Sequence, residues 1–169
     1  MIKAIFATDL QGGMGYQNSL PWPHDKEDLK HFKVTTSGDI VVMGSNTWLD
    51  PMMPKPLPNR TCVVVTNQDI KLFNQAHEVI AGTWLKESLE LLEQHNPDKT
   101  IWIIGGAKLL LSCLPFIKEI NLTTFMSEYN CDVKLDMAEY LKPFNKTTEE
   151  FGRNKIYSNW ARKCKNQTI

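Results

Sequence analysis

The sequence predicts an α/β fold in which a mostly parallel sheet carries helices on both faces. Short apolar runs rich in β-branched residues alternate with segments of helical periodicity, the pattern of parallel strands joined by crossover helices. Several runs end in glycine or small polar residues, where strands of such a sheet open onto a ligand site. Near the end of the chain, two strand-like segments flank Gly152-Arg153-Asn154 without a helix between them. We therefore expect the C-terminal strand to join the sheet antiparallel.

Length and composition predict one domain spanning residues 1–169, because neither a linker nor an internal repeat divides the chain. The 19 basic and 19 acidic residues cancel, which argues against a nucleic-acid partner or a membrane surface. No apolar run reaches the roughly 20 residues of a membrane span. The four cysteines show no CxxC spacing, so we expect neither a metal site nor a disulfide framework. A reducing cytoplasm is the expected location.

In the first half of the chain, the apolar run at 2–8 predicts a buried strand and the glycine-rich segment 11–19 predicts a loop. Asp25 is placed to cap a helix that reaches about residue 35 and carries Leu29 and Phe32 on one face. The remaining elements are a strand at 40–43, a short helix after Gly44, an irregular proline-rich segment at 51–58, and strands at 61–66 and 78–81.

In the second half, Thr83 is expected to cap a helix that ends near Asn96-Pro97. Its apolar residues recur at helical spacing as Trp84, Leu85, Leu89 and Leu92. The elements that follow are a strand at 100–104, a helix at 107–114 stopped by Pro115, a strand at 117–125, a short turn near 137–141, and strands at 144–151 and 155–163.

Two of the strand ends are suited to phosphate. Gly105-Gly106 lies between a strand and a helix, so backbone amides there can approach an anion. A tight turn without a ligand explains the same glycines equally well. Gly44-Ser45-Asn46-Thr47 begins a second helix and, taken alone, is better explained by simple capping than by a ligand. Together, two such ends suit the two phosphates of a dinucleotide.

Asp28 and Arg60 are the charged residues of interest outside these strand ends. Asp28 shares a helix face with Phe32, four residues later, although the helix dipole alone explains an acid in a first turn. Arg60 is either an ordinary surface charge or, if it faces a cleft, a bidentate carboxylate ligand. No Ser-His-Asp, Cys-His or paired-carboxylate arrangement is evident. A single acid and two dinucleotide-like ends favour hydride transfer assisted by one protonation.

The ordered set of motifs resembles dihydrofolate reductase over nearly the whole chain. The motifs, in the family's order and with similar gaps, are Gly13-Met14-Gly15, Leu20-Pro21-Trp22-Pro23, Asp28 with Phe32, Met43-Gly44-Ser45-Asn46-Thr47-Trp48, Pro56-Leu57-Pro58-Asn59-Arg60, Ile104-Gly105-Gly106-Ala107 and Thr123. Each motif is weak alone, whereas their order is specific.

The resemblance implies an eight-stranded sheet and the NADPH-dependent reduction of 7,8-dihydrofolate to tetrahydrofolate, for one-carbon and thymidylate metabolism. Expected partners are dihydrofolate and antifolate inhibitors, and a monomer is expected. The implied catalytic residues are Asp28, Trp22, Leu20 and Thr123. The implied substrate-binding residues are Ile5, Ala7, Asp28, Phe32, Leu57, Arg60 and Thr123. The implied cofactor-binding residues are Ala7, Met14, Gly15, Asn18, Ser19, Leu20, Gly44, Ser45, Asn46, Thr47, Thr66, Asn67, Ile104, Gly105, Gly106, Ala107, Lys108, Leu109 and Leu110.

The chain also departs from the family pattern. Ser45 stands where an arginine is frequent, and Asn67 where many members have serine, which leaves Lys108 as the cation for a 2′-phosphate. Leu110 replaces a frequent aromatic residue, and Cys131 a glycine before Asp132, which we expect to bond the Gly15 region. Two other hypotheses remain: a related pyrimidine reductase of riboflavin synthesis, and a non-catalytic nucleotide-binding protein of the same fold.

Overall fold

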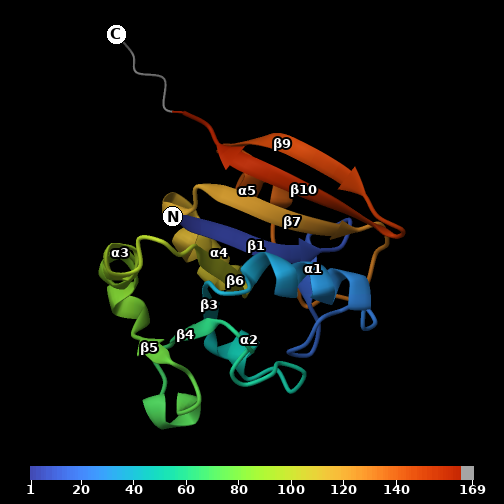
Figure 1. Cartoon of the computed structure of the whole chain (residues 1–169). Helices are drawn as coiled ribbons and strands as arrows, with labels where there is room; N and C mark the ends of the chain where they lie inside the picture. Colours follow the sequence, from blue (N-terminus) through green and yellow to red (C-terminus); the bar gives the residue numbers. More distant parts are fainter. Residues whose placement is uncertain (165–169) are drawn as a thin grey trace.

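The computed structural model describes residues 1–164 and has an eight-stranded sheet at its centre (Figure 1). Its strands lie in the order β5-β4-β3-β6-β1-β7-β10-β9. Their bounds are Ile2–Thr8 (β1), Ile40–Gly44 (β3), Thr61–Val65 (β4), Glu78–Ile80 (β5), Ile101–Gly105 (β6), Glu119–Phe125 (β7), Phe144–Phe151 (β9) and Lys155–Arg162 (β10). A small second sheet pairs β2 (Gly13–Gly15) with β8 (Val133–Lys134).

The helices and single turns lie between these strands. The α-helices are α1 (Lys26–Thr36), α2 (Ser45–Trp48), α3 (Leu85–His95), α4 (Ala107–Cys113) and α5 (Met137–Leu141). The 3-10 turns are η1 (Ile70–Phe73), η2 (Gly82–Trp84) and η3 (Leu114–Phe116).

The strand directions confirm the predicted mixed sheet. From β5 to β7, each described neighbour pair is parallel, with β1 between β6 and β7. β10 runs antiparallel to both of its neighbours, β7 and β9. A chain that makes a hairpin without a crossover helix has no other way to extend the sheet.

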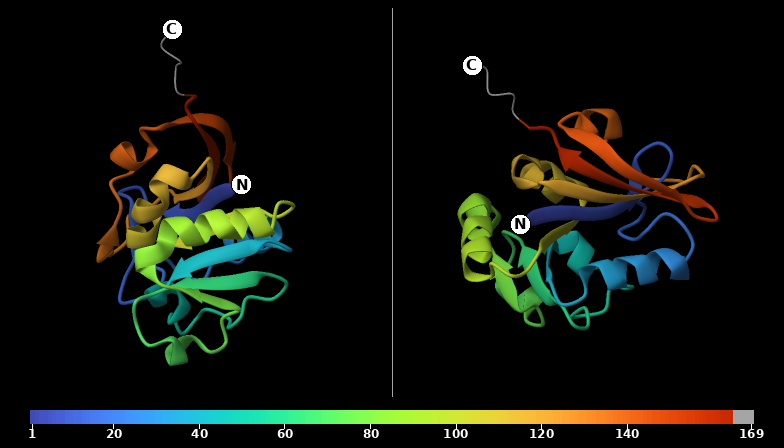
Figure 2. Two further views of the ribbon diagram at one scale, coloured as in Figure 1. Left: turned by 90° about the vertical axis from the view of Figure 1, so that its left-hand side faces the viewer. Right: turned by 45° about the horizontal axis from the view of Figure 1, so that its top comes forward.

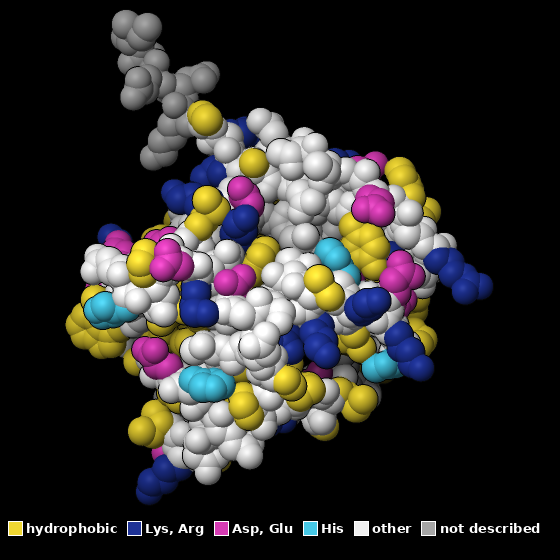
Figure 3. All heavy atoms as spheres, in the orientation of Figure 1, with side chains coloured by type: hydrophobic (Ala, Val, Ile, Leu, Met, Phe, Trp, Pro, Cys, Tyr) yellow, Lys and Arg dark blue, Asp and Glu magenta, His cyan; other side chains and the backbone are white. Residues whose placement is uncertain are grey.

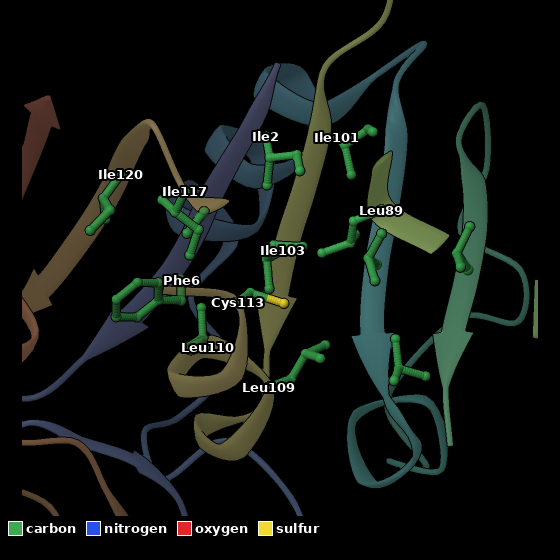
Figure 4. Packing of buried hydrophobic residues seen from close by; sticks show 14 of the residues in the cluster. Ile2, Phe6, Leu89, Ile101, Ile103, Leu109, Leu110, Cys113, Ile117 and Ile120 are labelled. Carbon is green, nitrogen blue, oxygen red and sulfur yellow. The ribbon is translucent and has the colours of Figure 1, made fainter. Parts of the chain in front are cut away.

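The two faces of the sheet bury two separate clusters, because successive side chains of a strand point to opposite faces. One cluster packs the sheet against α3, α4 and α5 and includes Leu89, Leu110 and Tyr140; Figure 4 shows most of the strands and α4 meeting there. The other cluster packs against α1 and α2 and includes Ile5 and Trp48. Figure 2 shows α1 and α5 on opposite sides of the sheet.

Five local features differ from the sequence expectations. The segment expected to be a loop contains β2, and η1 was not predicted. Thr83 is not a helix cap: it lies inside η2, and α3 begins after Trp84 without a side-chain cap. Trp84 is exposed, so it is not part of the buried face of α3. The helix expected to reach residue 114 ends at Cys113 and continues as η3 through Pro115.

The described surface mixes both signs of charge. On the face seen in Figure 3, basic and acidic side chains are interspersed. None of the helices within residues 1–164 combines the length and the apolar character that a membrane span requires.

Candidate active site

The site is built around α1, whose first turn carries Asp28. Asp25 caps the helix as predicted: its backbone is extended and its Oδ1 accepts a hydrogen bond from the Asp28 amide at 2.9 Å. Phe32 lies one turn further along the same face and packs against the cluster of Ile5 and Leu57. The cap therefore fixes where Asp28 meets the sheet, and Phe32 extends that surface towards Leu57.

The Asp28 carboxyl group lies in an environment that favours its neutral form. Burial raises its pKa, and the Thr123 hydroxyl and the positive charges of His31 and Lys155 only partly oppose that rise. Thr123 is buried in β7 and pairs with Ala7 of β1, so both residues line this part of the sheet. The acid therefore retains a proton to a higher pH than an exposed aspartate does.

Trp22 closes the site beside the first turn of α1. The indole is buried and stacks on Phe125 with ring centroids 4.5 Å apart, and its edge meets Tyr129. Two aromatic partners thus hold Trp22 in one orientation. Leu20, two residues earlier, is 51% exposed and is free to move with the segment that precedes it.

Arg60 is buried near the opposite end of α1. The side chain is 7% exposed, and its guanidinium group lies over the Phe32 ring. Nε donates a hydrogen bond to the Pro58 carbonyl at 3.0 Å, and Nη1 donates one to Thr36 Oγ1 at 3.2 Å. Burial lowers the pKa of the guanidinium group, which still stays charged at any physiological pH. Among residues 1–164, no carboxylate forms an ion pair with it. The charge is therefore available to an anionic ligand.

The two glycine-containing strand ends come together, as the dinucleotide hypothesis requires. Gly105 has φ +122°, which only glycine adopts readily, and a cis peptide bond joins it to Gly106. A Cβ atom built on either residue would lie 3.8 Å from Thr47 Oγ1, and one on Gly44 would lie 3.8 Å from the Gly106 nitrogen. The ends of β3 and β6 and the starts of α2 and α4 thus form one backbone-lined surface.

The end of β4 carries two more of the predicted cofactor residues, and both are held in place. Thr66 Oγ1 accepts from the Gln68 amide at 3.0 Å, and Asn67 Oδ1 accepts from the Gly82 amide at 2.9 Å. The Asn67 side-chain amide nitrogen remains as a donor.

The segment from Gly15 to Leu20 is anchored at its base and has few contacts at its tip. The Asp132 amide donates to the Gly15 carbonyl at 2.9 Å and Asp132 Oδ2 accepts from the Gln17 amide at 2.9 Å, which confirms the expected contact of Asp132 with this region. Ser19 reaches Asp50 only at 3.4 Å. Asn18 has positive φ and is exposed. The contacts that hold this segment therefore lie mainly at its base.

Asp9 is a buried group whose role sequence reasoning missed. Its carboxylate accepts from the amides of Gln11, Gly13 and Tyr129 at 2.8–2.9 Å, and it faces Cys131. Although burial raises its pKa, these backbone donors outweigh that effect and the net pKa is lowered. Asp9 therefore ties the base of the Gly15–Leu20 segment to the loop after β7. An acid directly before a glycine-rich turn was the available signal.

Two other buried groups near Asp28 left no local signal in the sequence. Tyr157 of β10 pairs in register with Thr123, and its hydroxyl is buried with no partner among the described residues. Burial and the Asp28 charge raise the Tyr157 pKa. Lys155, at the start of β10, is 1% exposed and pairs with Asp25. Both residues lie about 130 positions after Asp28, so only the fold brings them together.

The predicted cofactor residues are not all placed at this surface. Met14 packs partly against the large core cluster, and Leu109 and Leu110 are buried within that cluster. We therefore remove the side chains of Leu109 and Leu110 from the candidate cofactor surface. The other predicted cofactor residues stay a prediction: Ala7, Met14, Gly15, Asn18, Ser19, Leu20, Gly44, Ser45, Asn46, Thr47, Thr66, Asn67, Ile104, Gly105, Gly106, Ala107 and the exposed Lys108.

Comparison with known proteins identifies the family. The dihydrofolate reductase family model matches residues 1–163. Dihydrofolate reductase type 8 of Escherichia coli is 31% identical over 151 residues, 88% of each chain. The dihydrofolate reductase of Bacillus subtilis is 35% identical over 132 residues, 78% of this chain and 73% of that protein. The solved structure of an Enterococcus faecalis dihydrofolate reductase, complexed with NADP(H) and RAB-propyl, has a TM-score of 0.79 at 25% identity over 96% of each chain. The chain belongs to the dihydrofolate reductase family.

Proposed function

We propose that this chain reduces 7,8-dihydrofolate to 5,6,7,8-tetrahydrofolate with NADPH, by hydride transfer to C6 and protonation of N5. One observation carries the proposal: the same helix presents a buried acid with a raised pKa and, one turn later, Phe32 beneath an unpaired guanidinium. A pterin with a glutamate tail offers an amino group with a ring nitrogen at one end and a carboxylate at the other. Asp28 and Arg60 match these two ends.

Each side chain of the substrate site then has a role. Asp28 accepts hydrogen bonds from the pterin 2-amino group and N3, with Thr123 completing the network and Trp22 closing it from above. Ile5, Ala7 and Phe32 form the walls of the pterin slot, and Leu57 packs on the aminobenzoyl ring. Arg60 binds the glutamate α-carboxylate through its guanidinium fork.

The surface around Gly105 fits a dinucleotide cofactor. The glycines leave the backbone open to close approach, and Thr47 supplies a hydroxyl beside them. Gly105, Gly106 and Ala107 hold the pyrophosphate, while Ser45, Asn67 and Lys108 are the donors for the 2′-phosphate. When bound, NADPH supplies the hydride. Leu20 closes over the nicotinamide and excludes water from the reacting atoms.

Burial raises the pKa of Asp28, so this carboxyl group keeps its proton to a higher pH than an exposed aspartate does and can act as the proton source of the site. Because burial is the main cause of the rise, closure of Leu20 over the bound substrate strengthens it further. The neutral carboxyl group supplies the proton for N5, directly or through water, and is left as the carboxylate that accepts from the 2-amino group and N3. Turnover therefore falls as pH rises above the pKa of Asp28.

We also propose that the chain acts as a single-domain monomer in the cytoplasm, where dihydrofolate and antifolate inhibitors compete for the Asp28–Arg60 site. The continuous sheet from β5 to β9 supports a single domain. The four cysteines are free, which suits a reducing compartment.

A spectrophotometric assay tests the proposal. The purified chain, mixed with NADPH and dihydrofolate, should lose the NADPH absorbance at a rate proportional to enzyme, with tetrahydrofolate as the product. NADH in place of NADPH should react more slowly. If tetrahydrofolate does not form above the background rate, the proposed reaction is wrong.

A further inference from the structure

Lys155 is a buried cation to which the proposed reaction assigns no role. It is the first residue of β10 and is 1% exposed, which is unusual for lysine. Its Nζ lies 3.1 Å from Asp25 Oδ2 and 3.6 Å from Glu27 Oε2, both on the N-terminal end of α1. A buried charge that is paired in this way requires both partners, because loss of one leaves the other uncompensated.

The first path from Lys155 to the site runs through Asp25. The two oxygens of this carboxylate have separate partners: Oδ2 faces Lys155, and Oδ1 accepts from the Asp28 amide. Burial raises the pKa of Asp25, but the Asp28 amide and Lys155 outweigh it, so the net pKa is lowered and the carboxylate stays ionised. The residue that caps the catalytic helix is thus fixed by Lys155.

The second path runs through Phe125. Lys155 pairs with Phe125 in the β7–β10 register, and its Nζ lies over the Phe125 ring at 5.7 Å from the centroid. Trp22 stacks on this same ring. A methyl group on Gly152 would lie 3.1 Å from Lys155 Cγ, so the hairpin turn leaves just enough room for the lysine stem.

We propose that Lys155 is a positioning residue of the active site, which holds the first turn of α1 and the Trp22–Phe125 stack together and so sets the place and charge environment of Asp28. This inference rests on the proposed function of the same site. Lys155 does not need to touch substrate or cofactor for this role. It acts through Asp25 on one side and through Phe125 on the other.

The charge environment of Asp28 makes the role measurable. The groups that face Asp28 or its close neighbours are Asp25 at the N-cap of α1, Glu27 and His31 of α1, Thr123 of β7, Glu150 of β9, and Lys155 and Tyr157 of β10. Lys155 lowers the Asp28 pKa and Asp25 raises it, and with both present the two effects oppose each other. Removal of one charge must therefore shift the pKa in a direction that depends on which charge is removed.

Two measurements on the full chain test the role. The first follows the 13C NMR signal of the Asp28 carboxyl carbon during a pH titration, and the second follows the hydride-transfer rate as a function of pH; each gives the pH of a midpoint. Lys155→Met should raise both midpoints by about half a unit or more, and Asp25→Asn should lower them. Asparagine can still accept the Asp28 amide, so Asp25→Asn removes charge and keeps the cap. At low pH, where Asp28 is protonated in both proteins, Lys155→Met should also lower kcat several-fold and leave the KM for NADPH unchanged.

Matched variants separate positioning from a general effect on stability. Lys155→Arg keeps the charge and should restore the wild-type midpoint. Lys146→Met removes a lysine of the same hairpin that pairs with Glu149 instead, and should move neither midpoint. The double variant Lys155→Met with Asp25→Asn should return the midpoint towards wild type.

Equal midpoints in Lys155→Met, Asp25→Asn and wild type would overturn the proposal, even if melting temperatures fell. If Lys155→Met does not fold, Lys155→Gln, which removes the charge and keeps a polar side chain, takes its place, and only an upward shift of the Asp28 midpoint agrees with the proposal. The NMR titration needs no turnover. A wild-type chain without dihydrofolate reduction therefore refutes the proposed function, whereas unshifted titrations refute the role of Lys155.

Discussion

The two ends of α1 each lie against a buried cation, but the two cations have different partners. At the first turn, Lys155 is neutralised by the carboxylates of Asp25 and Glu27. Near the last turn, Arg60 is held only by neutral oxygens, those of Pro58 and Thr36. A buried cation with carboxylate partners is already compensated, whereas one held only by neutral oxygens has no ionic partner of its own. This contrast supports the proposals that Lys155 supports the site and that Arg60 binds a ligand within it.

Substitution of Asp28, which lies between the two cations, should have the largest effect on turnover. Asp28→Asn should lower kcat at neutral pH by about 10²–10⁴-fold, because the proton source is lost while the side chain keeps its shape. NADPH binding, measured by fluorescence titration, should stay within about twofold of wild type. Glu87→Gln, an acid in the first turn of α3, is the matched control and should turn over normally. Normal turnover by Asp28→Asn would reduce Asp28 to a helix-end residue.

The charge of Arg60 should contribute to substrate binding. Arg60→Ala should raise the KM for dihydrofolate about 30-fold, the equivalent of about 2 kcal/mol for a charged bidentate contact. With a pterin substrate that lacks the glutamate tail, wild type and Arg60→Ala should have similar KM values. An unchanged KM for dihydrofolate would place the carboxylate elsewhere.

Stability measurements should distinguish the two cations. Lys155→Met should lower the free energy of unfolding at neutral pH by about 2 kcal/mol, because two carboxylates lose their cationic partner. The loss is limited because both carboxylates stay partly exposed to water. Arg60→Met removes a charge that lacks an ionic partner, so its free energy of unfolding should change by less than about 1 kcal/mol in either direction. Urea denaturation of both variants at neutral pH measures the difference. Equal losses would show that both cations are structural.

The parts of the fold that the sequence predicted are those whose signal is local and repeated. The apolar runs of β1, β3, β4 and β6 could be assigned because a buried parallel strand is apolar along its whole length. β2 was missed because Gly-Met-Gly has no alternating pattern and pairs with only two residues of β8. Thr83 resembled a cap, but the chain makes a 3-10 turn there before α3 begins.

The residues of the candidate site also fall into those that a local motif indicates and those that it does not. Asp28, Arg60 and the glycines at the strand ends lie in short motifs, so their order along the chain was informative. Lys155 and Tyr157 act through partners distant in sequence, and no spacing rule connects residue 25 with residue 155. Leu110 lies in a motif that suggested the cofactor surface, but its side chain is buried in the core. A motif gives the position of a residue in the chain but not the direction of its side chain.

The position of Lys155 at the start of β10 has a consequence for the order of folding. α1 is synthesised early, yet its acid meets Thr123 and its cap meets Lys155, so the surroundings of Asp28 depend on contacts that span most of the chain. Such long loops close late during folding. A nascent chain that has not yet formed the β9–β10 hairpin can contain α1 but lacks the finished environment of Asp28. Activity should therefore appear together with the last hairpin, after most of the parallel sheet has formed.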